Sequence, residues 1–390
     1  MPRNSIRRKT QAQMCLLLGA LLVTVYLYEY FTDHKTLHLR DVKNSVSQTK
    51  APTKSNSTAY SWPRCQQNVS AANQSGFSSF TVNFQNFLYY RHCRHFPLLL
   101  DIPDKCGGPS KSADVFLLLV IKSAPVNYDR REVLRKTWAK ERLHNGVWIR
   151  RVFIVGNTDP NPLLERERMN KLLQLEQREY NDILQWDFKD SFYNLTLKQI
   201  LFLEWMEINC PHARFLLNGD DDVFANTDNM VKYLQSLKDN DGSKHLFIGS
   251  MMYYQPPVRE VENRYFVSEE VFKPDYFPPY CSGGGYLLSG YTASVIYNMS
   301  KSVGFIPIDD AYMGMCLAKA ELSPASHIGV HPHAWRIPSS KIDQYDPCYF
   351  KEELLVHGFR SANMFFMWQR LHDPDLKCDP SETKEEPFKL

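Results

Sequence analysis

The chain has 390 residues, of which 43% are hydrophobic and 23% charged, so it can bury a core and is neither wholly disordered nor collagen-like. Lysine and arginine number 46 against 43 acidic residues, a net charge of +3. This balance excludes a protein that binds nucleic acid mainly through its phosphates. An aromatic fraction of 13% suits a large core or surfaces that stack on sugar rings, and composition does not choose between them.

A basic N-terminus precedes an apolar run that predicts a membrane anchor. Arg3, Arg7, Arg8 and Lys9 come before an apolar span at residues 14–31. A bilayer core needs about 20 apolar residues in a helix, and no small-residue cleavage site follows this span. We therefore predict a cytosolic tail at 1–13, an uncleaved signal anchor at 14–31 and a lumenal remainder, with an ordinary cleaved signal as the alternative.

Two further features fit a lumenal location. Cys15 lies in the anchor, and the remaining cysteines are even in number, which permits disulfides in an oxidising compartment. The chain also carries Asn-x-Ser/Thr glycosylation sequons, whose alternative reading is chance because the pattern is short. The sequon asparagines are Asn56, Asn68, Asn73, Asn194 and Asn298.

Composition divides the lumenal part into a stem and one domain. Residues 32–76 are rich in polar residues and are predicted to form a flexible stem, and residues 77–390 form the domain. Apolar runs and helical periodicity alternate along it, which predicts an α/β fold with a mainly parallel sheet. The expected elements are strands at 114–121, 151–155 and 214–217, and helices at 129–140, 162–180 and 195–210.

The acidic run Asp220-Asp221-Asp222 directly follows a predicted buried strand. Ligands of open α/β sheets gather at the carboxyl ends of strands. Residues i and i+2 of an extended segment share a face, so Asp220 and Asp222 can converge while Asp221 points away. Converging carboxylates suit Mg²⁺ or Mn²⁺, which can in turn hold a diphosphate. The alternative is a solvated acidic turn.

A second acidic pair, Asp309-Asp310, opens a predicted helix after Pro307. One of these carboxylates is a candidate general base, and the alternative is a helix cap. Between the two acidic clusters, Gly283, Gly284 and Gly285 either let a backbone approach a ligand closely or form a plain turn.

These motifs together resemble the β-1,3-glycosyltransferases. The resemblance rests on residues 116–123, the Arg130-Arg131-x-x-Leu-Arg-x-Thr-Trp138 run, Asn194-Leu-Thr-Leu-Lys198, the two acidic clusters and Cys281-Ser-Gly-Gly-Gly-Tyr286. Segments at 89–98, 182–188 and 346–348 are most similar to the β-1,3-N-acetylglucosaminyltransferase branch, and within it to enzymes that extend core 1 O-glycans and lactosamine chains.

The resemblance implies a GT-A fold in a Golgi type II membrane protein, with Mn²⁺ as cofactor and UDP-GlcNAc as donor. GlcNAc would be transferred with inversion to O3 of galactose, on O-glycans, lactosamine chains or glycolipids. The resemblance implies no nucleic-acid partner, and it leaves the oligomeric state open. Asp310 would be the base, with Asp309 as second candidate. Asp222 and Asp220 would bind the metal, and Lys122, Arg131, Asp220, Asp221, Gly284 and Gly285 would meet the donor.

A late histidine is expected to complete the metal site. His327, His331, His333 and His357 are available, and His357 follows an apolar strand-like run, where a ligand would lie. We therefore expect His357. A β-1,3-galactosyltransferase that uses UDP-Gal would share every catalytic feature, and a metal-dependent lectin-like ectodomain is the alternative outside enzymes.

Overall fold

The structure, a computed structural model, describes residues 62–158, 163–332 and 346–378. The predicted tail and anchor lie outside these residues, as do Asn56, His333 and most of the predicted stem. Contacts group Ser61–Leu390 into one unit. Among the residues described, no helix combines the length and apolar character needed to cross a membrane.

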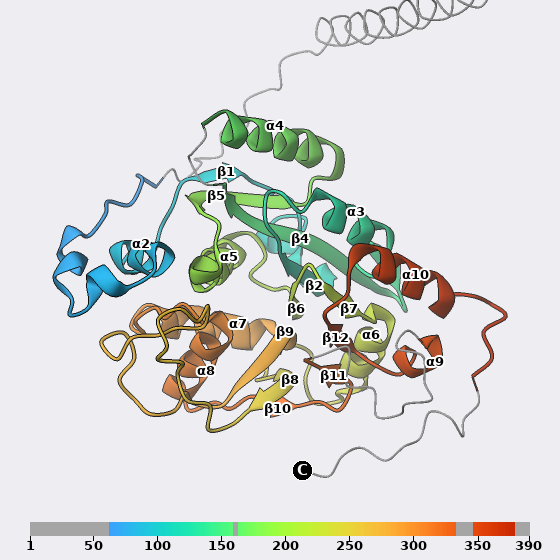
Figure 1. Cartoon of the computed structure of the whole chain (residues 1–390). Coiled ribbons are helices and arrows are strands. Elements are labelled where there is room, and N and C mark those ends of the chain that lie inside the picture. The colour runs from blue at the N-terminus through green and yellow to red at the C-terminus, as the bar shows by residue number, and fades with distance from the viewer. Residues whose placement is uncertain (1–61, 159–162, 333–345, 379–390) are drawn as a thin grey trace, which may run out of the picture. The chain divides into compact units, whose positions relative to one another are not determined.

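The centre of the fold is a mixed sheet whose middle strands are parallel (Figure 1). Its strand order is β1-β5-β4-β2-β6-β9-β8-β10, and β3 pairs with β4. Strands β5, β4, β2 and β6 run parallel to one another, and β9 is antiparallel to both β6 and β8. The strands are β1 Leu98–Leu100, β2 Val115–Lys122, β3 Arg142–His144, β4 Val147–Asn157, β5 Ile183–Lys189, β6 Phe215–Asp220, β8 Phe247–Met252, β9 Tyr280–Ser289 and β10 Ala325–Ser326.

Helices cover both faces of this sheet. Strand β2 is buried along its whole length, with Leu118 and Val120 in one apolar cluster and Leu117, Leu119 and Ile121 in the other. The first cluster includes side chains of α2 Val82–Tyr90, α5 Leu195–Asn209, α7 Gly290–Ser300 and α8 Asp309–Lys319. The second includes side chains of α3 Tyr128–Lys136, α4 Leu163–Tyr180, α6 Thr227–Ser236, α9 Pro347–Phe350 and α10 Ser361–Leu371.

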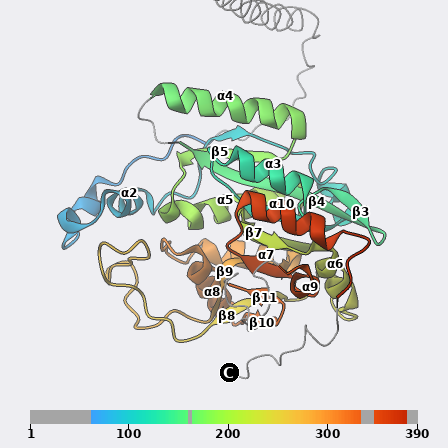
Figure 2. The same cartoon turned by 45° about the vertical axis from the view of Figure 1, so that its right-hand side comes forward.

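A small second sheet brings the C-terminal part of the chain to the end of β6. It has the order β11-β12-β7, from strands Val330–His331, Leu355–His357 and Val223–Ala225. Strand β12 is antiparallel to β7, so His357 lies opposite Val223. Figure 2 shows this sheet beside α10 and α6.

The predicted α/β class and mainly parallel sheet centre are confirmed, and each predicted strand and helix is present with shifted ends. The structure adds two features. The glycine-rich segment is the interior of β9 rather than a plain turn, and its glycines let neighbouring elements pack closely. Residues before 77, which the sequence assigns to the stem, also pack on the domain, since Cys65 is bonded to Cys93 and Ala71 is buried in the core.

A buried ionic network joins α3 and α4 to the parallel strands. Arg131 and Arg135 of α3 donate to Glu176 of α4, over 2.6–2.9 Å. Arg135 and Arg151 both donate to Asp182, which is completely buried. Burial raises the pKa of Asp182, but the two arginines outweigh it and hold that pKa below its ordinary value. The network therefore keeps Asp182 ionised.

Asp182→Ala should destabilise the domain by about 3–5 kcal/mol, because it leaves Arg151 and Arg135 buried without their shared counterion. Denaturant unfolding followed by tryptophan fluorescence measures this loss. Asp239→Ala, at an exposed position, is the control and should change stability by less than about 0.5 kcal/mol. Equal stability of the two variants would contradict the structural role of the network.

Candidate functional site

The site forms at the carboxyl edge of the parallel strands. Lys122 ends β2 and Asp220 ends β6, and the two residues are direct partners in the register of these strands. The chain then turns into β7, and this turn carries Asp221 and Asp222. The expected position of the acidic run, directly after a buried strand, is confirmed.

Lys122 joins the two acidic clusters. Its ammonium Nζ lies 3.0 Å from Asp220 Oδ1 and 2.8 Å from Asp309 Oδ2, and its side chain is 5% exposed. Burial lowers the pKa of Lys122, but Asp220 and Asp309 outweigh it and raise that pKa well above the ordinary value. Lys122 is therefore an internal counterion of Asp220 and Asp309, and its expected contact with a donor stays a prediction.

Asp220, Asp222 and His357 form a group with the geometry of a metal site. Each offers one ligand atom, and these atoms lie within 4.8 Å of one another. His357 Nε2 is 3.4 Å from Asp222 Oδ1, and its Nδ1 is 3.1 Å from the Pro332 carbonyl oxygen. With Nδ1–H donating to that carbonyl, Nε2 is the ring nitrogen that faces the carboxylates and could bind an ion. The structure thus brings together the expected ligand residues.

Backbone contacts fix Asp222 beside His357. The amides of Gly358 and Phe359 both donate to the Asp222 carbonyl oxygen, over 3.1 and 2.8 Å. The hydrogen bond from His357 to Asp222 raises the pKa of His357. Burial raises the pKa of Asp222, but His357 and Arg130 outweigh it and hold that pKa below its ordinary value. Without a metal ion, an imidazolium here partly neutralises the carboxylate.

The glycines of β9 make room for this histidine. Gly284 has φ +80°, and a Cβ there would lie 2.7 Å from the His357 ring. A Cβ on Gly285 would lie 2.7 Å from Leu355 Cδ1 and 2.9 Å from the Asn218 carbonyl oxygen. Both glycines therefore allow protein groups to pack closely, and their expected donor contact stays a prediction.

Asp309 and Asp310 differ in their partners. Asp309 is buried and accepts from Lys122, so its side chain serves as an ionic partner rather than the expected cap. No described residue donates a hydrogen bond to the Asp310 carboxylate. Burial, and then the charges of Asp309 and Asp220, raise the pKa of Asp310 to about 8. A raised pKa and free lone pairs are the properties of a general base.

Asp221 points away from the metal group, as the alternation along an extended segment predicts. It is buried and accepts from Ser123 over 2.7 Å, Asn127 over 2.8 Å and Arg130 over 2.7 Å. These protein groups occupy both oxygens of Asp221, and its expected donor contact stays a prediction. Arg130, which sequence reasoning missed, also lies 3.4 Å from Asp222 and is the half-exposed cation of this site.

Arg131 also has another role than expected. Its side chain is completely buried, and besides Glu176 it donates to Ser123 Oγ and to the carbonyl oxygens of Ala124 and Pro125. These bonds hold the turn after β2 rather than a ligand. The sequence does not show which arginine of the Arg130-Arg131 doublet is buried. The site contact expected of Arg131 therefore belongs to Arg130, which lies beside Asp222.

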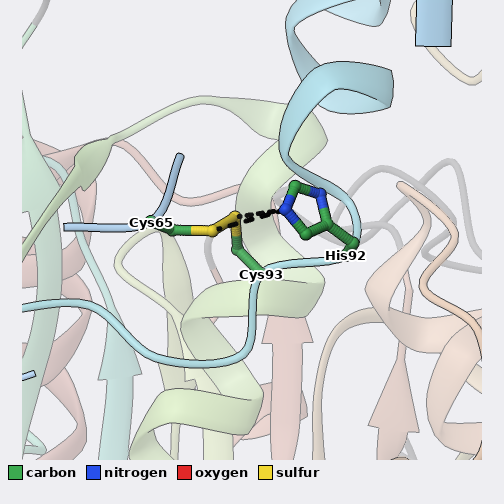
Figure 3. A group of neighbouring side chains, drawn as sticks. All are labelled: Cys65, His92 and Cys93. Carbon is green, nitrogen blue, oxygen red and sulfur yellow. Dashed lines mark hydrogen bonds between the residues drawn. A yellow bond between two sulfur atoms is a disulfide. The ribbon is translucent and has the colours of Figure 1, made fainter. Parts of the chain in front are cut away.

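The other candidate histidines that the structure describes have structural partners. His331 Nε2 lies 2.7 Å from Glu353, and His327 Nδ1 accepts from the Gly329 amide. A second group with metal-ligand chemistry contains His92, Cys65 and Cys93. Figure 3 shows that its two sulfurs are bonded to each other, so neither is a thiolate that could bind a metal. Disulfides also join Cys106–Cys210 and Cys348–Cys378, whereas Cys281 and Cys316 are buried free thiols.

The described sequons differ in exposure. Asn68, Asn73 and Asn298 are exposed, whereas Asn194 is 8% exposed and donates to the Lys189 carbonyl oxygen over 2.8 Å. Asn194 lines a cavity of about 230 Å³ that shares no residue with the acidic site. Glycan attachment at Asn194 would therefore have to precede the packing of this segment.

Comparisons with known proteins agree with this arrangement. The family model described as Galactosyltransferase matches residues 129–327. A human protein named N-acetyllactosaminide beta-1,3-N-acetylglucosaminyltransferase 3 is 45% identical, over 95% of this chain and 96% of its own. A human acetylgalactosaminyl-O-glycosyl-glycoprotein beta-1,3-N-acetylglucosaminyltransferase is 42% identical over 97% of both chains. A mouse UDP-GlcNAc:betaGal beta-1,3-N-acetylglucosaminyltransferase 7 is 38% identical, over 80% of this chain and 77% of its own. The predicted resemblance is confirmed, and the chain belongs to the galactosyltransferase family.

Proposed function

We propose that this protein transfers GlcNAc from UDP-GlcNAc, in β-1,3 linkage, to galactose at the end of O-glycan or lactosamine chains. The observation that carries the proposal is the free Asp310 carboxylate beside the Asp220–Asp222–His357 group. A base next to a cation site is what the transfer of a sugar from a nucleotide diphosphate requires. The names of the relatives support this donor and these acceptors over the family description, which names galactose.

The fold is proposed to be of the GT-A type, with a mainly parallel sheet that presents an acidic run at its carboxyl edge. Mn²⁺ is the proposed cofactor. Two carboxylates and one imidazole Nε2 within 4.8 Å form a ligand set that suits this ion. When bound, the cation would neutralise negative charge on the diphosphate of the donor.

In the proposed reaction, O3 of the acceptor galactose attacks the anomeric carbon of GlcNAc. The bond from that carbon to the diphosphate oxygen breaks, and UDP leaves with the electron pair. Asp310 takes the proton from O3, since a neutral hydroxyl is a poor nucleophile. Lys122 forms ion pairs with Asp309 and Asp220. These pairs keep the two negative charges close to Asp310, while the proton from O3 goes to Asp310 and to neither of them. Attack from the side opposite the diphosphate inverts the configuration.

A panel of UDP-sugars with Mn²⁺ tests the donor. UDP-GlcNAc should give transfer to a β-galactoside and some hydrolysis without acceptor, and UDP-Gal should be a poor donor. Preference for UDP-Gal would favour the β-1,3-galactosyltransferase alternative. A folded protein that binds glycans but turns over no UDP-sugar would instead be a lectin.

We further propose that residues 14–31 anchor the protein in the Golgi membrane with the domain in the lumen. Without this segment, a chain that begins at residue 32 behind a cleavable signal should be secreted, glycosylated and active in the same assay. The full-length chain should stay in the membrane fraction, with its N-terminus in the cytosol. Sequencing of the N-terminus tests this, and a mature start beyond Phe31 in the unmodified protein would contradict the anchor.

Asp222→Asn should abolish transfer and leave the fold intact, because the amide keeps one oxygen ligand but loses the charge that attracts Mn²⁺. His357→Ala should raise the Mn²⁺ concentration for half-maximal activity by at least about tenfold. Electron paramagnetic resonance of Mn²⁺ should show weaker binding in both variants. His331→Ala removes a histidine that pairs with Glu353 instead and is the matched control. Unchanged Mn²⁺ affinity in both Asp222→Asn and His357→Ala would refute the metal site.

Asp310→Asn should lower kcat by about 10²–10⁴, because the amide keeps the size of the side chain but cannot accept a proton. Binding of UDP-GlcNAc with Mn²⁺ should be retained. Asp309→Asn is the matched variant, and it should keep more activity because Asp309 orients Lys122 rather than taking the proton. Isothermal titration of the donor and acceptor turnover separate binding from chemistry, and an inactive Asp309→Asn with an active Asp310→Asn would reverse the assignment.

The pH dependence follows from the same carboxylate. The base acts when deprotonated, so activity is present above the pKa of Asp310 and is lost as pH falls through it. Because that pKa is raised from its ordinary value, the acidic limb of kcat/KM should lie well above about 3.9. In the complex with donor and cation, the positive charge of the cation should lower the pKa of Asp310. The acidic limb of the kcat profile should therefore lie at lower pH than that of the kcat/KM profile. An acidic limb near 4 in both profiles would contradict this environment.

A further inference from the structure

The long loop of residues 253–279 connects β8 to β9 and lies on the side of α2 (Figure 2). Strand β9 is antiparallel to both β6 and β8, so β6 and β8 point the same way. The carboxyl end of β8, where Tyr253 and Tyr254 follow, therefore lies at the same edge as Asp220. The start of β9, preceded by Tyr276, lies there too.

Two tyrosines on this loop form an exposed aromatic pair. Tyr254 is 80% exposed and Tyr276 54% exposed, and their ring centroids lie 6.2 Å apart in an edge-to-face arrangement. The Phe277 amide donates to the Gln255 carbonyl oxygen over 2.9 Å, which ties the two ends of the loop together. Tyr254 adopts φ +50°, an uncommon conformation for a bulky residue. The loop thus holds two large rings in water at a fixed distance.

Close packing connects this pair to the proposed base. A Cβ on Gly314 of α8 would lie 2.7 Å from both the Pro279 carbonyl oxygen and Tyr280 Cβ, so α8 contacts the end of the loop at this point. Asp310 lies four residues before Gly314 and therefore on the same face of the helix. The Tyr280 ring in turn packs edge-to-face against Phe277, next to Tyr276. A continuous series of packed residues thus runs from α8, which carries Asp310, to the aromatic pair on the loop.

A tyrosine surface suits a neutral sugar. One face of a galactose ring presents C–H groups that pack against an aromatic face, while its hydroxyls bond to water or to polar groups at the ring edge. Tyrosine supplies such area with few rotatable bonds, and so at a low entropy cost. The pair carries no charge, so it fits a neutral glycan better than the diphosphate of the donor, whose negative charge the cation proposed at Asp220, Asp222 and His357 would neutralise.

We propose that Tyr254 and Tyr276 bind the acceptor glycan, by stacking on the sugar that precedes the terminal galactose while that galactose lies at Asp310. The proposal rests on the function proposed above and adds where the chain of the acceptor lies. It makes the β8–β9 loop a determinant of acceptor preference, because a monosaccharide acceptor cannot reach both Asp310 and the tyrosine pair.

Steady-state kinetics with two acceptors test this proposal. With N-acetyllactosamine as acceptor, the double variant Tyr254→Ala/Tyr276→Ala should raise KM at least about fivefold, a loss of about 1 kcal/mol of binding. With methyl β-galactoside, its kcat/KM should match that of the unaltered protein. The KM for UDP-GlcNAc and donor hydrolysis should also be unchanged. Tyr254→Phe/Tyr276→Phe keeps the rings and should restore the lactosamine KM.

Tyr291→Ala is the matched control, because Tyr291 is 46% exposed and follows β9 at the opposite edge of the sheet. An unchanged lactosamine KM in the double alanine variant would overturn the tyrosine site while leaving the proposed function intact. An equal loss with both acceptors would also overturn it, since that result indicates a general disturbance of the site. Failure of the unaltered protein to transfer to any galactoside would instead refute the proposed function, and the tyrosine site with it.

Discussion

The buried ammonium of Lys122 is the interaction on which the site depends. It holds Asp220 at the end of β6 and Asp309 at the start of α8, two carboxylates 89 residues apart in the chain. Without a cation between them, desolvated carboxylates this close would repel one another or take up protons. Lys122 can occupy that place because β2 is the middle strand, flanked by β4 and β6, and ends in register with Asp220. The central strand therefore sets the distance between the two acidic clusters.

Much of this arrangement is legible in the sequence. Strand β2 is an uninterrupted apolar run because both of its faces are buried, and the acidic run after β6 marks the carboxyl edge of the sheet. His357 could be selected among the late histidines because it follows an apolar run, which the structure shows to be β12. The positions of these residues could be predicted because hydrophobic pattern and strand ends are local properties of the chain.

The sequence does not show those partners that are distant along the chain. Nothing local distinguishes Arg131, buried against Glu176, from Arg130, half-exposed beside Asp222. The glycines of β9 look like a ligand loop, because His357 and Leu355, for which Gly284 and Gly285 make room, lie 70 or more residues away in the chain. Asp309 looks like a cap because its partner Lys122, at the end of β2, lies 187 residues earlier in the chain. Pairing across the fold, rather than residue type, decides these roles.

Asp310 lies between a charged side and an uncharged side of the site. On one side lie Asp220 at the end of β6, Asp222 in the turn before β7 and His357 at the end of β12, the group proposed to bind a cation. On the other side, Gly314 brings α8 against Tyr280 and the loop before β9, which carries uncharged aromatic rings. An inverting displacement needs this division, because the nucleophile must approach the anomeric carbon from the side opposite the leaving group. Asp310 lies at the start of α8 between these two environments, a position that fits the base proposed for such a displacement.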